Sequence, residues 1–100
     1  MGDAVAIEWE AYWRSGSGPT SLLIAERRPE RRYLLVAAYG VGGAMWLWPE
    51  MQTGSYGIEP MDGQTFVRID RAIYDSLACE PWYLWIDSTM SVRVIDAYEV

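Results

Sequence analysis

The chain has 100 residues, a net charge of −6 and a hydrophobic content of 51%, which predicts one globular domain, residues 1–100, and not a disordered segment. It contains no histidine and no lysine. Their absence excludes serine–histidine and cysteine–histidine catalysis, histidine-based metal sites and lysine Schiff bases. We therefore expect a protein that is not an enzyme and has no catalytic residue, no metal and no cofactor.

A small carboxylate-based enzyme is the one catalytic alternative. A pair of acids such as Glu8 and Glu10 can perform acid–base chemistry, but pairs of this kind arise by chance in a chain with fourteen acids. The single Cys79 cannot form an internal disulfide, which favours a reducing, cytoplasmic location.

The first segment, residues 4–14, fits two structures. Ile7, Trp9, Ala11 and Trp13 alternate with polar residues as in a strand, whereas the spacing of Val5, Trp9 and Trp13 also suits one face of a helix. The content of aromatic and β-branched residues favours the strand.

The central stretch, residues 21–48, predicts a meander of three antiparallel strands. An apolar run over residues 22–25 and another over residues 33–38 flank a turn at Pro29, so we expect these runs to pair with each other. Glycines in residues 40–43 make a second turn, and the third strand ends at Trp48. Leu35 and Val36 are both expected to be buried, because a strand that is apolar on both faces is normally covered on both.

The remaining segments complete the fold class. Residues 49–63 form a long connection rich in turn residues, and Asp70 is the expected N-cap of one short helix near residues 70–79. Residues 82–100 predict a C-terminal hairpin. We therefore expect an α+β domain with a mainly antiparallel sheet of about six strands. The uncharged run of residues 33–49 is at the lower length limit for a membrane span, but its glycines and proline indicate a hairpin, so no membrane partner is expected.

Charge is unevenly distributed along the chain. Residues 26–32 hold four arginines and two glutamates, whereas the remainder holds four arginines and twelve acids. The body is therefore acidic, which disfavours direct binding of nucleic acid and suits a basic protein partner. The arginines at the turn allow two interpretations: a solvated turn with surface ion pairs, in which Arg27 lies opposite Arg32, or a fork that seeks an anion.

These features favour a small acidic binding protein that occludes a larger basic protein or nucleoprotein complex. Toxin–immunity pairs and phage anti-defence or anti-CRISPR-type inhibitors are analogous in size and charge only. The alternative is a structural or assembly subunit, such as a phage particle component, that pairs through sheet edges. The meander would place Tyr33, Tyr39, Trp46 and Trp48 on one face, either as core or as interface. The predicted partner-binding residues are Arg27, Arg28, Arg31, Arg32, Trp48, Glu50, Tyr56, Glu59 and Asp62.

Overall fold

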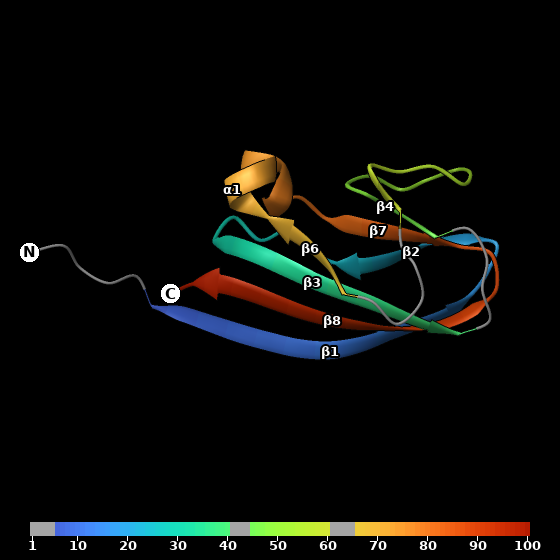
Figure 1. The fold of residues 1–100 in the computed structure, drawn as a ribbon, viewed down its shortest axis with the longest axis horizontal. Helices are drawn as coiled ribbons and strands as arrows, with labels where there is room; N and C mark the ends of the chain where they lie inside the picture. The colour runs from blue at the N-terminus through green and yellow to red at the C-terminus, as the bar shows by residue number, and fades with distance from the viewer. Residues whose placement is uncertain (1–5, 41–44, 61–65) are drawn as a thin grey trace, which may run out of the picture.

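The computed structural model describes residues 6–40, 45–60 and 66–100, which form two antiparallel sheets and one short helical segment (Figure 1). The first sheet has the strand order β1-β8-β3-β6 and the second the order β2-β7-β4-β5. The predicted α+β class is thus confirmed. The elements are β1 (Ile7–Ser17), β2 (Thr20–Ala25), β3 (Arg31–Gly40), β4 (Trp46–Trp48), β5 (Glu59–Pro60), β6 (Val67–Asp70), α1 (Arg71–Tyr74), a 3-10 helix (Asp75–Cys79), β7 (Trp82–Ile86) and β8 (Thr89–Glu99).

The strand pairs are nested along the chain. β1 pairs with β8, β2 with β7, β3 with β6, and β4 with β5. Two further ladders, β3 with β8 and β4 with β7, join these pairs into sheets. This is the strand order of a jelly roll, in which two sheets pack face to face. Because such folds serve unrelated functions, the function has to be argued from the surface.

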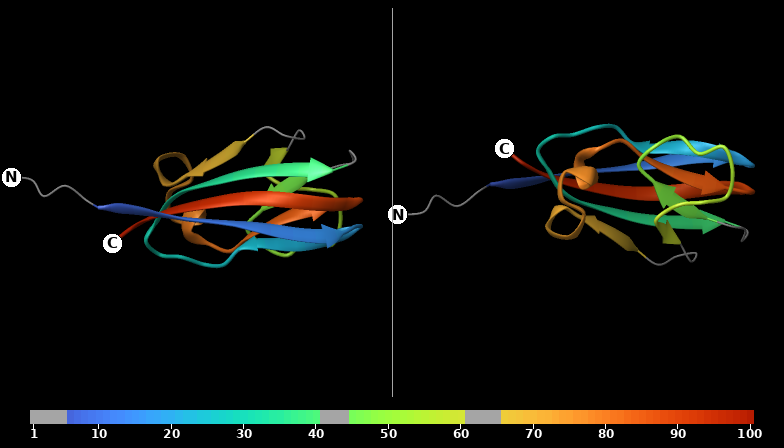
Figure 2. Two further views of the ribbon diagram at one scale, coloured as in Figure 1. Left: turned by 90° about the horizontal axis from the view of Figure 1, so that it is seen from below. Right: turned by 90° about the horizontal axis from the view of Figure 1, so that it is seen from above.

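The predicted meander over residues 21–48 is wrong in its pairing, although its strands are present. β2 and β3 lie in different sheets, and the connection of residues 26–30 crosses from one sheet to the other (Figure 2). The alternation of side chains fixes which face of a strand is buried, but it does not fix which strand lies beside it. Residues 41–44, which hold most of the second predicted turn, lie outside the described residues.

The C-terminal segment also forms two strands that do not pair as the predicted hairpin. β7 belongs to the second sheet and β8 to the first, so the chain changes sheets at Asp87 and Ser88. β1 and β2 are joined in the same way through Gly18 and Pro19. The amide nitrogen of Gly18 donates a hydrogen bond of 3.1 Å to the carbonyl oxygen of Ser88. The two crossings therefore lie side by side at one end of the sandwich (Figure 1).

The core lies between the two sheets. Alternate residues of each central strand are completely buried there, as in β7 and β8. Val36 is buried as expected, but Leu35 is only half-buried because it points to the outer face of the first sheet. The first segment is a strand from Ile7 onward, as its composition favoured. The largest apolar side chains in the core are Trp82, Ile24, Leu34, Leu47, Ile69, Leu84, Ile86 and Met90.

Asp70 caps the helical segment as predicted. One of its carboxylate oxygens accepts a hydrogen bond of 2.9 Å from the backbone nitrogen of Ala72, and the other accepts one of 2.8 Å from Arg68 Nε. Helix α1 ends at Tyr74, because Asp75 has a positive φ of 54° that an α-helix does not allow, and a separate 3-10 helix follows over Asp75–Cys79. No helix within the described ranges is long and apolar enough to cross a membrane.

Acidification tests the role of Asp70. The backbone hydrogen bond from Ala72, followed by the one from Arg68, lowers the pKa of Asp70 below its ordinary value of 3.8. A lowered folded-state pKa stabilises the protein above the unfolded-state pKa, and this stabilisation is lost as the pH falls through the folded-state value. We expect Asp70→Ala to cost about 0.5–2 kcal/mol of unfolding free energy at neutral pH.

The difference between wild type and Asp70→Ala should then shrink once the pH falls below ~4. Urea denaturation of both proteins at neutral and acidic pH measures it. A difference that is the same at both pH values would contradict the assignment of the stabilisation to the ionised carboxylate.

Candidate protein-binding surface

Arg31 is completely buried, unlike the solvated or anion-seeking arginine that the sequence predicts. Its guanidinium donates to both carboxylate oxygens of Asp96, at 2.8 and 3.0 Å. It also donates to the backbone carbonyl oxygens of Glu26, Ala78 and Glu80, at 2.6, 3.0 and 2.9 Å. These five hydrogen bonds match the five N–H donors of a guanidinium. Arg31 therefore ties three segments together inside the protein, and its side chain does not reach the surface.

A β-bulge explains why Arg31 points inward. Arg31 lies opposite Tyr98 and Tyr33 lies opposite Ala97, so Arg32 is an extra residue in the ladder between β3 and β8. An extra residue reverses the side to which the residues before it point. Regular alternation would place Arg31 on the same outer face as Tyr33, whereas the bulge turns it toward the second sheet.

Arg28 helps to line a polar pocket of about 90 Å³ at the same end of the sandwich. Its Nη2 donates to Glu10 Oε2 at 3.1 Å, and its guanidinium carbon lies 4.0 Å from the centre of the Tyr98 ring. Its Nη1 lies 3.7 Å from Asp96 Oδ2 and makes no hydrogen bond within the part of the chain that the structure describes. The pocket holds equal numbers of carboxylates and guanidiniums, three of each, and its lining is Glu10, Tyr12, Arg14, Glu26, Arg27, Arg28 and Asp96.

Tyr12 forms the inner wall of this pocket as a neutral hydroxyl. Its oxygen donates a hydrogen bond of 2.8 Å to the backbone carbonyl of Ile24. Burial, followed by the nearby charge of Asp96, raises the pKa of Tyr12 above 10.0. The tyrosine therefore serves as a donor that links β1 to β2, and it is not poised to act as a base at neutral pH.

Arg27 and Arg32 are the more exposed members of the arginine cluster. Arg32 Nη1 donates to Glu99 Oε1 at 2.6 Å, and Arg71 Nη2 donates to the same oxygen at 2.9 Å. The hydrogen bond from Arg32 is the main cause that lowers the pKa of Glu99. Arg27 Nε lies 3.9 Å from a carboxylate oxygen of Glu80. The predicted opposition of Arg27 and Arg32 does not occur, because β2 and β3 do not pair.

β4 and the loop that follows it, which carry Trp48, Glu50 and Tyr56, lie toward the opposite end of the sandwich from the connection of residues 26–30 (Figure 1). Trp48 and Tyr56 contact each other edge to face, with ring centres 5.9 Å apart, and Glu50 is exposed beside them. Glu59 lies in β5, where its side chain is not described, and Asp62 lies outside the described residues. The structure thus divides the predicted set into two separate regions.

The loop after β4 is held against the outer face of the second sheet by Gln52. This side chain is 3% exposed and accepts a hydrogen bond of 2.6 Å from the hydroxyl of Ser21. Its amide nitrogen donates to the backbone carbonyls of Trp46 and Tyr56, at 2.8 and 3.0 Å. Trp46 and Trp48 are consequently half-buried under this loop, on a different sheet from Tyr33 and Tyr39. The prediction that the four aromatic residues share one face is therefore wrong.

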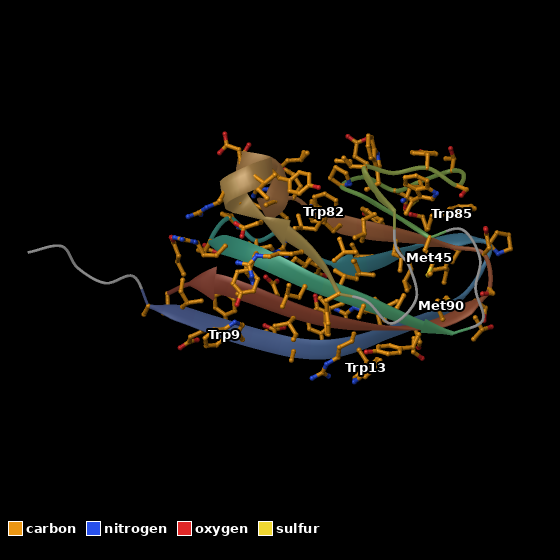
Figure 3. All side chains as sticks on the ribbon, viewed as in Figure 1. Trp9, Trp13, Met45, Trp82, Trp85 and Met90 are labelled. Carbon is orange, nitrogen blue, oxygen red and sulfur yellow. The ribbon has the colours of Figure 1, made fainter. Side chains whose placement is uncertain are left out.

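A different surface gathers exposed aromatic residues. It is the outer face of the first sheet, where Trp9 and Trp13 are 61% and 53% exposed. Both project from β1 away from the second sheet (Figure 3), and no other described element lies over them (Figure 1). We call this surface the aromatic face; by the strand register it comprises Trp9, Trp13, Tyr33, Leu35, Tyr39, Arg68, Arg93 and Ile95.

Contacts between neighbouring strands hold the aromatic face in place. Trp9 Nε1 donates a hydrogen bond of 2.6 Å to the hydroxyl of Tyr33, and the guanidinium carbon of Arg68 lies 4.0 Å from the centre of the Tyr33 ring. The rings of Trp13 and Tyr39 are 5.7 Å apart, and Arg93 lies 5.4 Å from the centre of the Trp13 ring. Ile95 lies between these two groups in the register. The face is therefore continuous across the four strands of the first sheet.

Sequence reasoning did not select Trp9 or Trp13 as binding residues. The alternation in β1 shows that the two tryptophans share a face, but apolar residues at alternate positions are normally assigned to the core. Here the polar set faces the second sheet, where Glu10 meets Arg28 and Tyr12 meets the carbonyl of Ile24. Glu10, the one charged residue between the two tryptophans, was the available signal, because a charge that faces the second sheet needs a partner there.

The fold and this surface define a β-sandwich protein with an exposed aromatic sheet face. Its sequence matches no known family model, and no curated protein or solved structure gives a significant match. The function therefore has to be argued from the chemistry of the surface.

Proposed function

We propose that this protein is a non-catalytic assembly subunit that binds another protein chain through its aromatic face. The observation that carries the proposal is the exposure of Trp9 and Trp13 within a continuous layer that includes Tyr33, Leu35 and Tyr39. Contiguous exposed apolar surface marks interaction sites, and tryptophan, tyrosine and arginine are the residue types that anchor them.

The two tryptophans provide a large part of the binding energy. Covering their exposed portions removes on the order of 250 Å² of apolar surface from water, which corresponds to roughly 6 kcal/mol before the cost of association. The hydrogen bond from Trp9 to Tyr33 and the ring contact of Trp13 with Tyr39 already restrict both side chains. Less side-chain entropy is therefore lost on binding than for freely rotating residues.

The distribution of charged residues favours assembly over inhibition. An inhibitor that occludes a basic partner by charge would present an acidic face, whereas an assembly subunit would present a long apolar edge. Near the arginine cluster, Glu26 and Glu30 lie in the same connection as Arg27 and Arg28, so acids and arginines are mixed there, while β1 is an eleven-residue edge strand that carries Trp9 and Trp13. This distribution supports the assembly subunit as the first candidate.

Inhibition of a larger basic protein, of the toxin–immunity or anti-defence kind, is the second candidate. The net charge of −6 favours it, together with exposed acids such as Glu26, Glu30 and Glu50 that form no ion pair with any described residue. Charges at the rim of an interface mainly steer the encounter of two proteins. In both cases we place the protein in a reducing compartment such as the cytoplasm, because its single cysteine is a buried free thiol.

Site-specific photocrosslinking in the source cell tests the proposal. Benzoylphenylalanine is placed at position 9 or 13 of the aromatic face, or at position 73, where Ile73 is 78% exposed on α1 and serves as the matched control. We expect a specific protein adduct from positions 9 and 13 and none from position 73. Trp13→Ser should then weaken binding of the captured protein by at least ~2 kcal/mol, as for a hot-spot residue.

Equal adducts from all three positions, or none from the aromatic face, would contradict the assembly proposal. The probe at position 9 can also be combined with either of two variants. If the adduct is lost in Glu26→Arg/Glu30→Arg but retained in Trp13→Ser, charge-driven inhibition is favoured instead.

A further inference from the structure

β1 leaves one edge of the first sheet open. It pairs with β8 over all eleven of its residues, from Ile7 opposite Glu99 to Ser17 opposite Thr89, and pairs with no other strand among the described residues. An open edge is a template for another strand, and proteins usually protect it with charged side chains, proline or a bulge. β1 has no proline, no lysine and no register shift against β8, and its charged residues Glu8, Glu10 and Arg14 are of both signs, so they can also pair with a second strand. Its edge is therefore suited to pairing.

We propose that β1 pairs with β1 of a second copy of the chain, antiparallel about a two-fold axis at Ala11. This inference concerns the strand edge, so it extends the proposed function without depending on what binds the aromatic face. In an antiparallel pair, opposite residues lie on the same face. Side chains alternate between the two faces along the strand. A two-fold axis that passes through a residue therefore places outer-face residues opposite outer-face residues, so both faces of the sheet continue across the pair. An axis between two residues does not.

Charge selects among these registers. An axis at Trp9 or at Glu10 brings glutamates opposite each other, which is destabilising. An axis at Ala11 places Glu8 opposite Arg14 of the second copy, and Trp9 opposite its Trp13, each twice by symmetry. Aromatic pairs and pairs of opposite charge are the favourable cross-strand combinations. The sequence of β1 is therefore self-complementary about Ala11.

The ion pairs already present in the protein favour the same axis. An axis at Tyr12 would place Glu10 opposite Arg14, but Glu10 is already bound to Arg28 at 3.1 Å. Glu8 and Arg14, by contrast, form no ion pair with any described residue; Arg14 only lies over the Tyr12 ring, at 4.3 Å. The axis at Ala11 thus joins the two charged side chains of β1 that lack an ionic partner in the described chain.

The position of the second sheet leaves room for this contact. The N-terminal half of β1 extends beyond the end of β2 along the long axis of the sandwich (Figure 1). A second copy would there meet the edge of one sheet and not of two. Pairing would join the two first sheets into one continuous sheet and bring the aromatic faces of both copies onto one side.

A cysteine at the axis tests the register. Ala11→Cys is made in the Cys79→Ala background, and the fold of each variant is verified by circular dichroism. In the proposed pair, the Cα atoms of the two residues at position 11 are ~4.5–5.5 Å apart, within the range of a disulfide. Ser15→Cys is the matched control, since the two positions 15 would lie eight residues apart along the strand, or about 26 Å. We expect a disulfide-linked dimer from Ala11→Cys only.

Analytical ultracentrifugation of reduced protein tests the charges. Glu8→Arg is expected to weaken dimerisation by at least tenfold, and Glu8→Arg/Arg14→Glu is expected to restore it, because the exchange re-forms both pairs in this register. No cross-link from Ala11→Cys, an equal cross-link from Ser15→Cys, or no recovery in the double variant would overturn the proposal. If cross-linking at Ala11 fails while the probe at position 13 still captures another protein, the dimer is refuted and the assembly function stands.

Discussion

Arg31→Met is expected to lower the free energy of unfolding by about 3–5 kcal/mol, because removal of one partner of a buried ion pair leaves the other charge uncompensated. Arg31 is fully buried, and Asp96, its bidentate partner, is 3% exposed. The substitution also leaves the carbonyls of Glu26, Ala78 and Glu80 without their donor. Glu26 lies in the connection between β2 and β3, whereas Ala78 and Glu80 lie in and directly after the 3-10 helix, so the loss should loosen this whole end of the sandwich.

Urea denaturation of Arg31→Met and of Arg27→Met measures this contribution. Arg27 is the matched control, since its side chain is 63% exposed and its ion pair with Glu80 is 3.9 Å long, so its replacement should change stability by less than ~1 kcal/mol. Arg31→Lys should also be strongly destabilising, because a single ammonium cannot reproduce the planar five-donor pattern. A cost for Arg31→Met similar to that for Arg27→Met would show that the buried network contributes little.

The location of the strands could be predicted from the sequence, but their partners could not. The apolar runs at residues 22–25, 33–38 and 82–86 are all strands in the structure. Neighbouring strands in a chain often pair, which made a meander and a C-terminal hairpin the natural expectation. In the nested order each pair instead joins distant segments, such as β1 with β8. Which strands pair depends on how the two sheets pack against each other, and this cannot be predicted from the sequence of any single strand.

The arginine cluster shows a second limit. Arg27, Arg28, Arg31 and Arg32 have similar sequence surroundings, yet one of them is completely buried. The bulge at Arg32 decides which one, and it is visible only once β3 is aligned with β8. Asp96, the buried acid that pairs with Arg31, is 65 residues away in the sequence. Composition indicated many arginines near a turn, whereas the role of each depends on contacts made by the folded chain.

The aromatic face shows a third limit, because the sequence defined two faces of β1 without indicating which one is exposed. Tryptophans on one side and charges on the other normally place the tryptophans in the core. On the inner side, Arg28 donates a hydrogen bond to Glu10, and Tyr12 donates one to the carbonyl of Ile24, so both polar residues find partners in the next strand and the connection after it. The tryptophans of β1 are therefore exposed, contrary to the usual assignment. The sequence identified this strand but did not indicate which of its faces points to solvent.

Gly18→Ala is expected to cost about 3 kcal/mol or more of unfolding free energy, because a side chain at this position would overlap backbone atoms. A Cβ atom at Gly18 would lie 2.1 Å from the carbonyl oxygen of Ile86 and 2.6 Å from the carbonyl carbon of Asp87. Neither atom can move aside like the end of a flexible side chain. The two crossings between the sheets would have to separate, with loss of the hydrogen bond from Gly18 to Ser88.

Gly54→Ala is the matched control for this substitution, since a Cβ there would meet only ring atoms of Tyr56 at 3.9–4.0 Å, an ordinary contact. Its effect should stay within ~0.5 kcal/mol. Urea denaturation of both variants gives the comparison, and circular dichroism shows whether the strands survive. Because the contact at Gly18 joins the crossing from β1 to β2 with the crossing from β7 to β8, it holds together the outer two of the four nested strand pairs. Equal stabilities of Gly18→Ala and Gly54→Ala would mean that the crossings can separate at little cost and that the nested pairing does not depend on their contact.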